Sequence, residues 1–284
     1  EIWKKNMQKE YGAFDIQFGL SSTPLLDRDR LYVQMIHGPW NEDPHTGLVV
    51  ALDKRTGKEI WKQERKTDAI DECKHSYTSP VMYEDDQQRF LVTHGADYCI
   101  AHRLEDGSEI WRCGNLHPKG AYNKTLRFVA SPACAPGLIV VPTAKKGKVV
   151  GIRPGGSGDI TDSEDFVAWT LPRNTPDVPS PVIHDGLVYL CRENGNLMAL
   201  DAETGKLVYE ERTTRERHRS SPVYADGNIY LTARNGVVTV VRAGEDFSVV
   251  ARNDVGEPIT ASPVFADGRL YLRTLKSLYA IGPQ

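Results

Sequence analysis

Residues 51–61 read ALDKRTGKEIW, and residues 199–209 repeat the pattern as ALDAETGKLVY. A shortened copy, LEDGSEIW, occupies residues 104–111. In every copy an acidic residue precedes a glycine, and an aromatic residue ends the segment a few positions later. Because glycine adopts positive φ without a steric penalty, it suits a tight turn with a bulge. Each copy therefore predicts two antiparallel strands joined by a tight turn, with the aromatic residue on the second strand.

A second motif, serine or threonine followed by proline, recurs along the whole chain, and we call these dipeptides the anchors. They are Thr23-Pro24, Ser79-Pro80, Ser131-Pro132, Ser180-Pro181, Ser221-Pro222 and Ser262-Pro263. Successive anchor prolines are 56, 52, 49, 41 and 41 residues apart. After each of the last three anchors, an Asp-Gly step introduces an alternating segment (DGLVYL, DGNIYL and DGRLYL), which is a strong hairpin signal. Each repeat therefore reads as four short strands with three tight connections.

Repeats of this length, with four strands each, are typical of β-propeller blades, which bury their faces against neighbouring blades. Trp3, Trp61, Trp111 and Trp169 fall near the ends of repeats, where a large ring can wedge between two blades. We therefore expect an all-β fold, with one propeller domain over residues 1–284 and six recognisable four-stranded antiparallel blades.

The two ends of the chain bear on the number of blades. The sixth repeat stops at Ile281-Gly282, before its fourth strand, and residues 1–5 have the character of the strand that it lacks. We expect residues 1–5 to belong to a preceding or shared blade. Either they close a six-bladed ring, or the chain is part of a seven- or eight-bladed protein, and the start at Glu1 favours the second alternative.

Composition excludes several classes of protein. Lys plus Arg number 35 and Asp plus Glu number 38, and this near-balance does not favour a nucleic-acid binder. No run of 18 apolar residues occurs, so no transmembrane segment is expected.

The five cysteines contain no Cys-x-x-Cys pair, and no metal site is predicted. Residues 37–45 hold two histidines and two acids, but no strand or helix fixes their geometry. Cys99 and Cys113 lie at equal distances from Asp106, so they are expected to face each other across two strands, as free thiols or as a disulfide.

The anchors, the Asp-Gly hairpins and the ALDxxTGxxxW pattern resemble the PQQ-like β-propeller repeat over essentially the whole chain. The segments HSYTSP (75–80), LRFVASP (126–132) and RENG (192–195) resemble BamB-like proteins of planctomycete-type bacteria. This likeness implies an exported or periplasmic protein. The family includes BamB, of the outer-membrane β-barrel assembly machinery, and the quinoprotein alcohol dehydrogenases.

The resemblance also implies what an enzyme of this family needs. Quinoprotein dehydrogenases hold PQQ against a tryptophan floor beneath a disulfide of adjacent cysteines, with a calcium ion bound by Glu, Asn and Asp. This chain has no adjacent cysteines, and its tryptophans other than Trp40 are explained by blade ends. We therefore expect no cofactor and no catalytic residue, with PQQ and calcium retained only for the dehydrogenase alternative.

Binding residues are expected on the channel face of the propeller. The loop before the first strand of a blade and the loop between its second and third strands emerge on this face, and such loops carry function. The residues expected on this face are together more basic than the chain as a whole and include Phe18, Lys145, Lys146, Arg217 and Arg219. The candidates for ligand or partner binding are Trp40, His75, Tyr77, His94, Asp97, Arg127, Arg192, Glu193, Asn194, His218, Arg234 and Arg273. We also expect two long loops on this face, at residues 62–75 and 112–127.

A basic channel mouth attracts anionic groups through its focused field. The sequence therefore favours a monomeric, non-catalytic scaffold of the bacterial cell envelope that binds a partner protein or peptide. The alternatives are a PQQ-dependent oxidoreductase of alcohols or sugars, and a binder of carbohydrates or small anions.

Overall fold

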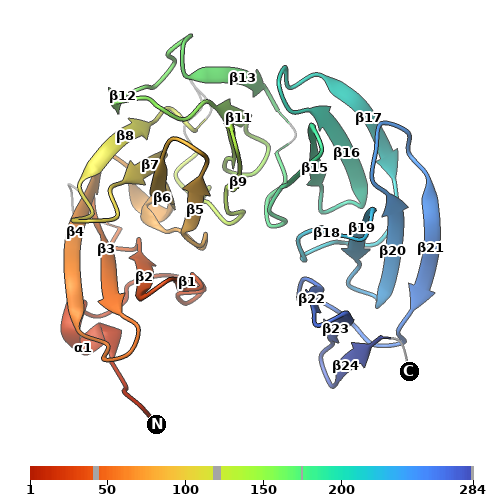
Figure 1. Ribbon diagram of the computed structural model, residues 1–284, viewed down its shortest axis with the longest axis horizontal. Helices are drawn as coiled ribbons and strands as arrows, with labels where there is room; N and C mark the ends of the chain where they lie inside the picture. The colour runs from red at the N-terminus through yellow and green to blue at the C-terminus, as the bar shows by residue number, and fades with distance from the viewer. Residues whose placement is uncertain (41–44, 118–122, 174, 283–284) are drawn as a thin grey trace.

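The computed structural model describes residues 1–40, 45–117, 123–173 and 175–282. In these residues six sheets follow one another along the chain and form an arc around a common centre (Figure 1). The arc is open between the first sheet and the last (Figure 1). The expected all-β propeller architecture is therefore confirmed.

The strands of the first three sheets have the following bounds. The first sheet holds β1 (Leu25–Asp27), β2 (Arg30–Met35), β3 (His45–Asp53) and β4 (Glu59–Thr67). The second holds β5 (Val81–Glu84), β6 (Arg89–Gly95), β7 (Tyr98–His102), β8 (Glu109–Cys113) and β12 (Gly158–Asp159). The third holds β9 (Ala133–Ala135), β10 (Leu138–Pro142), β11 (Val149–Ile152) and β13 (Val167–Leu171).

The remaining elements complete the described fold. The fourth sheet holds β14 (Val182–His184), β15 (Leu187–Cys191), β16 (Asn196–Asp201) and β17 (Leu207–Arg212). The fifth holds β18 (Val223–Ala225), β19 (Asn228–Thr232), β20 (Val237–Arg242) and β21 (Val249–Asp254), and the sixth holds β22 (Val264–Ala266), β23 (Arg269–Arg273) and β24 (Leu278–Ile281). Two short helices are α1 (Met7–Tyr11) and the 3-10 helix η1 (Asp71–Lys74).

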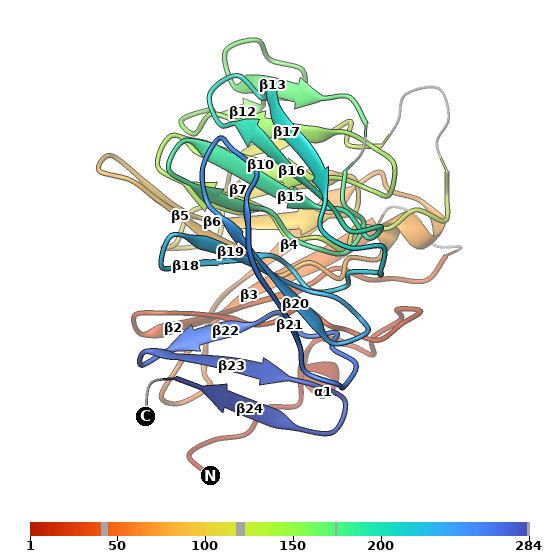
Figure 2. The same cartoon turned by 90° about the vertical axis from the view of Figure 1, so that its right-hand side faces the viewer.

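Strands that follow one another within a blade pair antiparallel, and β12 joins the second sheet by pairing in parallel with β8. Every residue of the second strands β10 and β15 is buried, whereas β23 of the last sheet has one buried residue. Strands of a stacked blade have apolar neighbours on both faces, which explains why β10 and β15 are apolar throughout. Figure 2 shows the β5–β6, β18–β19 and β22–β23 hairpins on one side of the molecule and η1 on the other.

The anchors form a chain of hydrogen bonds from blade to blade. In each step the backbone N–H of one anchor residue donates to the side-chain hydroxyl of the next anchor serine, at 2.9–3.0 Å. The series runs from Thr23 through Ser79, Ser131, Ser180 and Ser221 to Ser262. The following proline has no N–H, so the serine supplies the only backbone donor of the dipeptide.

A second inter-blade contact joins the aromatic residue of one blade to the turn of the next. The indole N–H of Trp3, Trp61 and Trp169 donates to the carbonyls of Lys54, Leu104 and Ala202 respectively, each at 2.8 Å. The rings lie on Gly57, Gly107 and Gly205, where a β-carbon would come within 2.5–2.6 Å of a ring atom. These glycines also have positive φ, so both the turn and the packing require glycine.

Trp111 departs from this rule for a local reason. The third blade lacks the Thr-Gly turn. The segment between its strands β11 and β13 instead contains β12, which pairs in parallel with β8 of the second blade. Trp111 is fully buried, and its indole nitrogen has no acceptor among the described residues.

Three further expectations can be compared with the structure. Cys99 and Cys113 are register partners on β7 and β8, as expected, and both are free thiols. Residues 62–67, expected in a loop, instead extend β4, because β3 continues opposite them as far as His45. Residues 1–6 form no strand, although Trp3 makes the inter-blade contact described above. The assignment of residues 1–5 to another blade stays a prediction, as does the single-domain organisation.

We expect Ser180→Ala to lower the free energy of unfolding by about 1–2 kcal/mol, because the amide of Ser131 then loses its acceptor. Urea unfolding measures the change. Ser180→Thr is the matched control, since a hydroxyl is retained and threonine already occupies the first anchor. An equal loss in both variants would contradict the role of the hydroxyl.

We expect Trp61→Ala to cost about 3–5 kcal/mol, because the ring is 7% exposed and lies between two blades. Trp61→Phe keeps part of the packing but loses the hydrogen bond to Leu104, so its cost should be clearly smaller. Thermal or urea unfolding of both variants tests the expectation, and a cost below about 1 kcal/mol for Trp61→Ala would rule out a buried wedge.

Candidate functional site

Two pockets open where segments preceding the anchors meet. The aromatic pocket has a volume of about 480 Å³ and is lined by Phe18, Ser21, Tyr77, Arg127, Val129, Val178 and Arg219. Each of these residues lies two to five positions before an anchor serine or threonine, and together they come from five successive repeats. The pocket is therefore built by the repeat itself, because the anchor hydrogen bonds bring equivalent positions together.

The contacts within the aromatic pocket hold its polar groups in place. The guanidinium of Arg127 lies 5.1 Å from the centre of the Phe18 ring, a cation–π arrangement. The Phe18 amide donates to the Tyr77 hydroxyl at 3.3 Å, and the two rings are 6.1 Å apart. Arg127 Nε lies 3.4 Å from Glu72 Oε1. Burial raises the pKa of Tyr77, so its hydroxyl stays protonated in this pocket.

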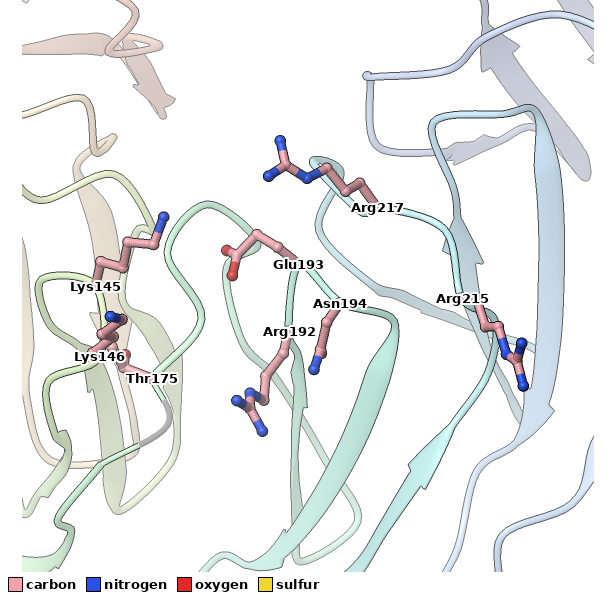
Figure 3. A pocket seen from close by; sticks show the side chains of 8 residues that line it. All are labelled: Lys145, Lys146, Thr175, Arg192, Glu193, Asn194, Arg215 and Arg217. Atoms are coloured by element: carbon pink, nitrogen blue, oxygen red, sulfur yellow. The ribbon is translucent and has the colours of Figure 1, made fainter.

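The basic pocket lies beside it, between the third, fourth and fifth blades. It has a volume of about 420 Å³, and its lining residues are Lys145, Lys146, Thr175, Arg192, Glu193, Asn194, Arg215 and Arg217 (Figure 3). Lys145 and Lys146 lie on the β10–β11 connection, and Arg192, Glu193 and Asn194 lie on the β15–β16 turn. These are connections between the second and third strands of a blade, so the expectation that such loops share a face with the pre-anchor segments is confirmed.

Five cationic side chains and one carboxylate give the basic pocket its charge. The carboxylate is already engaged: Glu193 Oε1 accepts hydrogen bonds from the amides of Asp177 and Val178, at 2.6 and 2.8 Å. Lys145 Nζ lies 3.6 Å from Asp177 Oδ2, and Arg192 Nη1 lies 3.0 Å from Glu210 Oε1. For Lys146, Arg215 and Arg217 no ion pair is found with any described residue.

The two pockets share their walls. The segment before the fourth anchor contributes Thr175 to the basic pocket and Val178 to the aromatic pocket. The segment before the fifth anchor contributes Arg217 to the first and Arg219 to the second. An extended ligand that crosses these two segments can therefore contact both pockets at once.

The predicted site residues divide into three groups. Tyr77 and Arg127 line the aromatic pocket, and Arg192, Glu193 and Asn194 line the basic pocket. Trp40, Arg234 and Arg273 are exposed but line neither pocket. The buried candidates are His75, His94, Asp97 and His218.

The buried histidines are held by backbone groups. His75 Nε2 contacts the Gly38 carbonyl at 3.1 Å, and His94 Nε2 contacts the Pro142 carbonyl at 2.8 Å. His218 Nδ1 lies 3.2 Å from the Glu216 carbonyl. None of the three lines either pocket.

The candidate list omitted several residues that line the pockets. Thr175 and Arg215 line the basic pocket, and Ser21, Val129 and Val178 line the aromatic pocket. The sequence does mark the lining of the aromatic pocket, because five of its residues lie two positions before an anchor serine or threonine. They are Ser21, Tyr77, Val129, Val178 and Arg219. Arg215 lies further from its anchor, and no repeat position marks it.

A family model described as outer membrane protein assembly factor BamB matches residues 1–164 and 164–246. The chain belongs to this family. BamB from Moraxella catarrhalis is a solved structure with 15% sequence identity and a TM-score of 0.67, and the match covers 93% of this chain and 73% of that chain. No curated protein sequence matches this BamB-family chain.

Two quinohemoprotein alcohol dehydrogenases share the same fold. The enzyme from Comamonas testosteroni has 13% identity and a TM-score of 0.60, covering 89% of this chain and 51% of that chain. The enzyme ADHIIG from Pseudomonas putida HK5 has 13% identity and a TM-score of 0.55, covering 85% of this chain and 43% of that chain. This BamB-family chain thus spans about half the length of these enzymes or less. Among the described residues, no helix has the length and apolar character needed to cross a membrane.

The two pockets do not fit a quinone cofactor of the dehydrogenase type. Neither is lined by a tryptophan, and the indoles of Trp3, Trp61 and Trp169 serve the blade turns instead. The one lining carboxylate, Glu193, accepts from two amides and so offers no free ligand set for calcium. The chain also lacks the adjacent cysteines of that branch.

We expect His94 to make stability depend on pH. Burial lowers the pKa of His94 from 6.5 to about 3, so the unfolded chain takes up a proton at higher pH than the folded chain. The contribution of neutral His94 to the free energy of unfolding is complete above the pKa of the unfolded chain, about 6.5. This contribution is lost as the pH falls from about 6.5 towards 3. From about pH 7 to about pH 5 the loss amounts to roughly 2 kcal/mol.

Urea unfolding at the two pH values, with His94→Gln as the comparison, measures this loss. Glutamine does not titrate in this range, so the variant should lose less stability on acidification than the wild-type chain. Identical pH dependence in the two proteins would contradict the assignment to His94.

Proposed function

We propose that this chain is a non-catalytic binding module of the bacterial cell envelope that holds an extended segment of a partner protein across its channel face. Acidic side chains of the segment occupy the basic pocket, and apolar side chains occupy the aromatic pocket. The observation that carries the proposal is the basic pocket itself, whose lining holds five cations and one engaged carboxylate in a protein of net charge −3.

The unpaired cations of the basic pocket and the exposed ring of Phe18 in the aromatic pocket favour an extended peptide over a compact ligand. Lys146, Arg215 and Arg217 have no ion pair with a described residue, so a carboxylate gains attraction there without displacing an existing partner. Phe18 is 63% exposed, and an apolar side chain that covers it removes that surface from water. An extended chain presents alternating side chains and so can address two adjoining pockets.

Membership of the BamB family supports a place in the envelope. The family model and the Moraxella catarrhalis structure both carry the name BamB, and the model describes an outer-membrane assembly factor. By that analogy we infer an exported protein whose partner is itself an envelope protein.

The test uses fluorescein-labelled peptides and the whole chain. An alternating glutamate–leucine peptide should bind saturably, and a lysine–leucine peptide of the same length should not. The double variant Lys146→Glu, Arg217→Glu should weaken binding about tenfold or more, because it replaces attraction with repulsion at the pocket. Fluorescence anisotropy at low and physiological salt measures the affinity, which should fall with salt.

A matched control separates the pocket from the overall charge. Arg55→Glu with Lys206→Glu makes the same change in net charge at exposed Thr-Gly turns of the opposite face. Binding should be nearly unchanged in this control. If both double variants weaken binding equally, the attraction is general and the basic pocket is not the site.

The two alternatives give different outcomes. Saturable binding of PQQ with calcium, with quenching of tryptophan fluorescence, would favour the oxidoreductase and contradict our proposal. Saturable binding of inorganic phosphate or an acidic sugar, without binding of the acidic peptide, would favour the binder of carbohydrates or small anions.

A further inference from the structure

Two arginines flank a buried histidine in the segment that leads to the fifth anchor. Arg217 lines the basic pocket, and Arg219 lines the aromatic pocket. The backbone between them is extended, because His218 forms an antiparallel bridge with Ala233. The Arg217 carbonyl also accepts a hydrogen bond from the amide of Arg234 at 2.8 Å. This pairing with the fifth blade fixes the direction in which each side chain of the segment leaves the backbone.

The side chains of this segment alternate between the interior and the solvent, as they do in a strand. His218 is 0% exposed, and Ser220 is buried and donates to the Thr232 carbonyl at 2.7 Å. Arg217 and Arg219 are both exposed. The two arginines therefore leave the segment on the same side, and two residues of extended chain place their Cα atoms about 7 Å apart.

Both guanidinium groups are available to a ligand. For Arg217 and Arg219, no ion pair or side-chain hydrogen bond is found with any residue that the structure describes. Two like charges at this separation repel each other, so the pair attracts a ligand that carries two negative charges at a similar separation.

The other arginines of the two pockets do not form such a pair. Arg127 and Arg192 each have a glutamate carboxylate oxygen within 3.4 Å. Arg215 has no such partner among the described residues, but its side chain points away from that of Arg217 (Figure 3). Arg217 and Arg219 are therefore the two unpaired cations that one short segment presents on one side.

An extended peptide has the same repeat as the segment that holds the two arginines. Its side chains at positions i and i+2 lie on one side about 7 Å apart, whereas those at i and i+1 lie on opposite sides. Two acidic residues separated by one residue can thus face both guanidinium groups at once. Hydrogen bonds between a guanidinium and a carboxylate are charge-assisted and stronger than those between neutral groups.

We propose that the channel face selects a partner segment in which two acidic residues are separated by one residue. One carboxylate pairs with Arg217 at the basic pocket, and the other pairs with Arg219 at the aromatic pocket. This inference rests on the proposed function and adds a requirement for sequence spacing to the requirement for negative charge.

The test uses the whole chain and three fluorescein-labelled peptides of equal length and composition. Each peptide carries two glutamates in a host of serine and leucine, and the glutamates are adjacent, separated by one residue or separated by two. The peptide with one intervening residue should bind about fivefold more tightly than the other two, because only this spacing places both carboxylates on one side of an extended chain. Fluorescence anisotropy measures the three affinities.

Variants assign the spacing preference to the arginine pair. Arg219→Gln should weaken binding of the preferred peptide and remove the difference between the three spacings. Arg219→Glu should bind more tightly to a peptide in which one of the two glutamates is replaced by lysine than to the original peptide. The matched control is Arg242→Gln, which removes one exposed charge at the far end of β20 and should keep the preference.

The outcomes separate this inference from the proposed function. Equal affinity for the three peptides, a preference for another spacing, or a preference that persists in Arg219→Gln would overturn the inference and leave the proposed function standing. The absence of binding by all three peptides would overturn both.

Discussion

The hydrogen bond between the amide of one anchor and the hydroxyl of the next sets the spacing of the blades around the centre. It recurs five times at 2.9–3.0 Å, while the number of residues between anchors varies from 41 to 56. The extra residues of the longer repeats are therefore accommodated away from the anchors, in strands such as β4 and in the connections. The tryptophan-on-glycine contacts act at the outer rim and oppose rotation of one blade against the next.

The position of the pockets follows from this constraint. The hydrogen bonds between anchors hold the backbone of successive blades close together at each anchor. Residues at the same offset before each anchor therefore lie near one another, and they line the aromatic pocket. The basic pocket forms where turns between second and third strands approach the same segments. A chain with a small negative net charge thereby gathers five cations in one place, which composition alone does not reveal.

Local patterns predicted the parts of the structure that repeat. The anchors, the Asp-Gly hairpins and the Thr-Gly turns were enough to infer four-stranded blades and the face on which Tyr77, Arg127 and Arg192 lie. The sequence could not show that His75 and His94 are buried, because their contacts come from distant segments: His75 Nε2 contacts the Gly38 carbonyl, and His94 contacts the Pro142 carbonyl and the Phe128 ring.

The anchor serine is both donor and acceptor, since its own amide reaches forward while its hydroxyl receives the amide from behind. Every blade therefore presents one hydrogen-bond donor to the next blade and one acceptor to the previous blade. A gene that duplicates or deletes one whole unit therefore leaves both new neighbours correctly matched, without any compensating substitution. Blade number in such a chain is free to drift by whole units, while the chemistry of each channel-facing segment diverges independently.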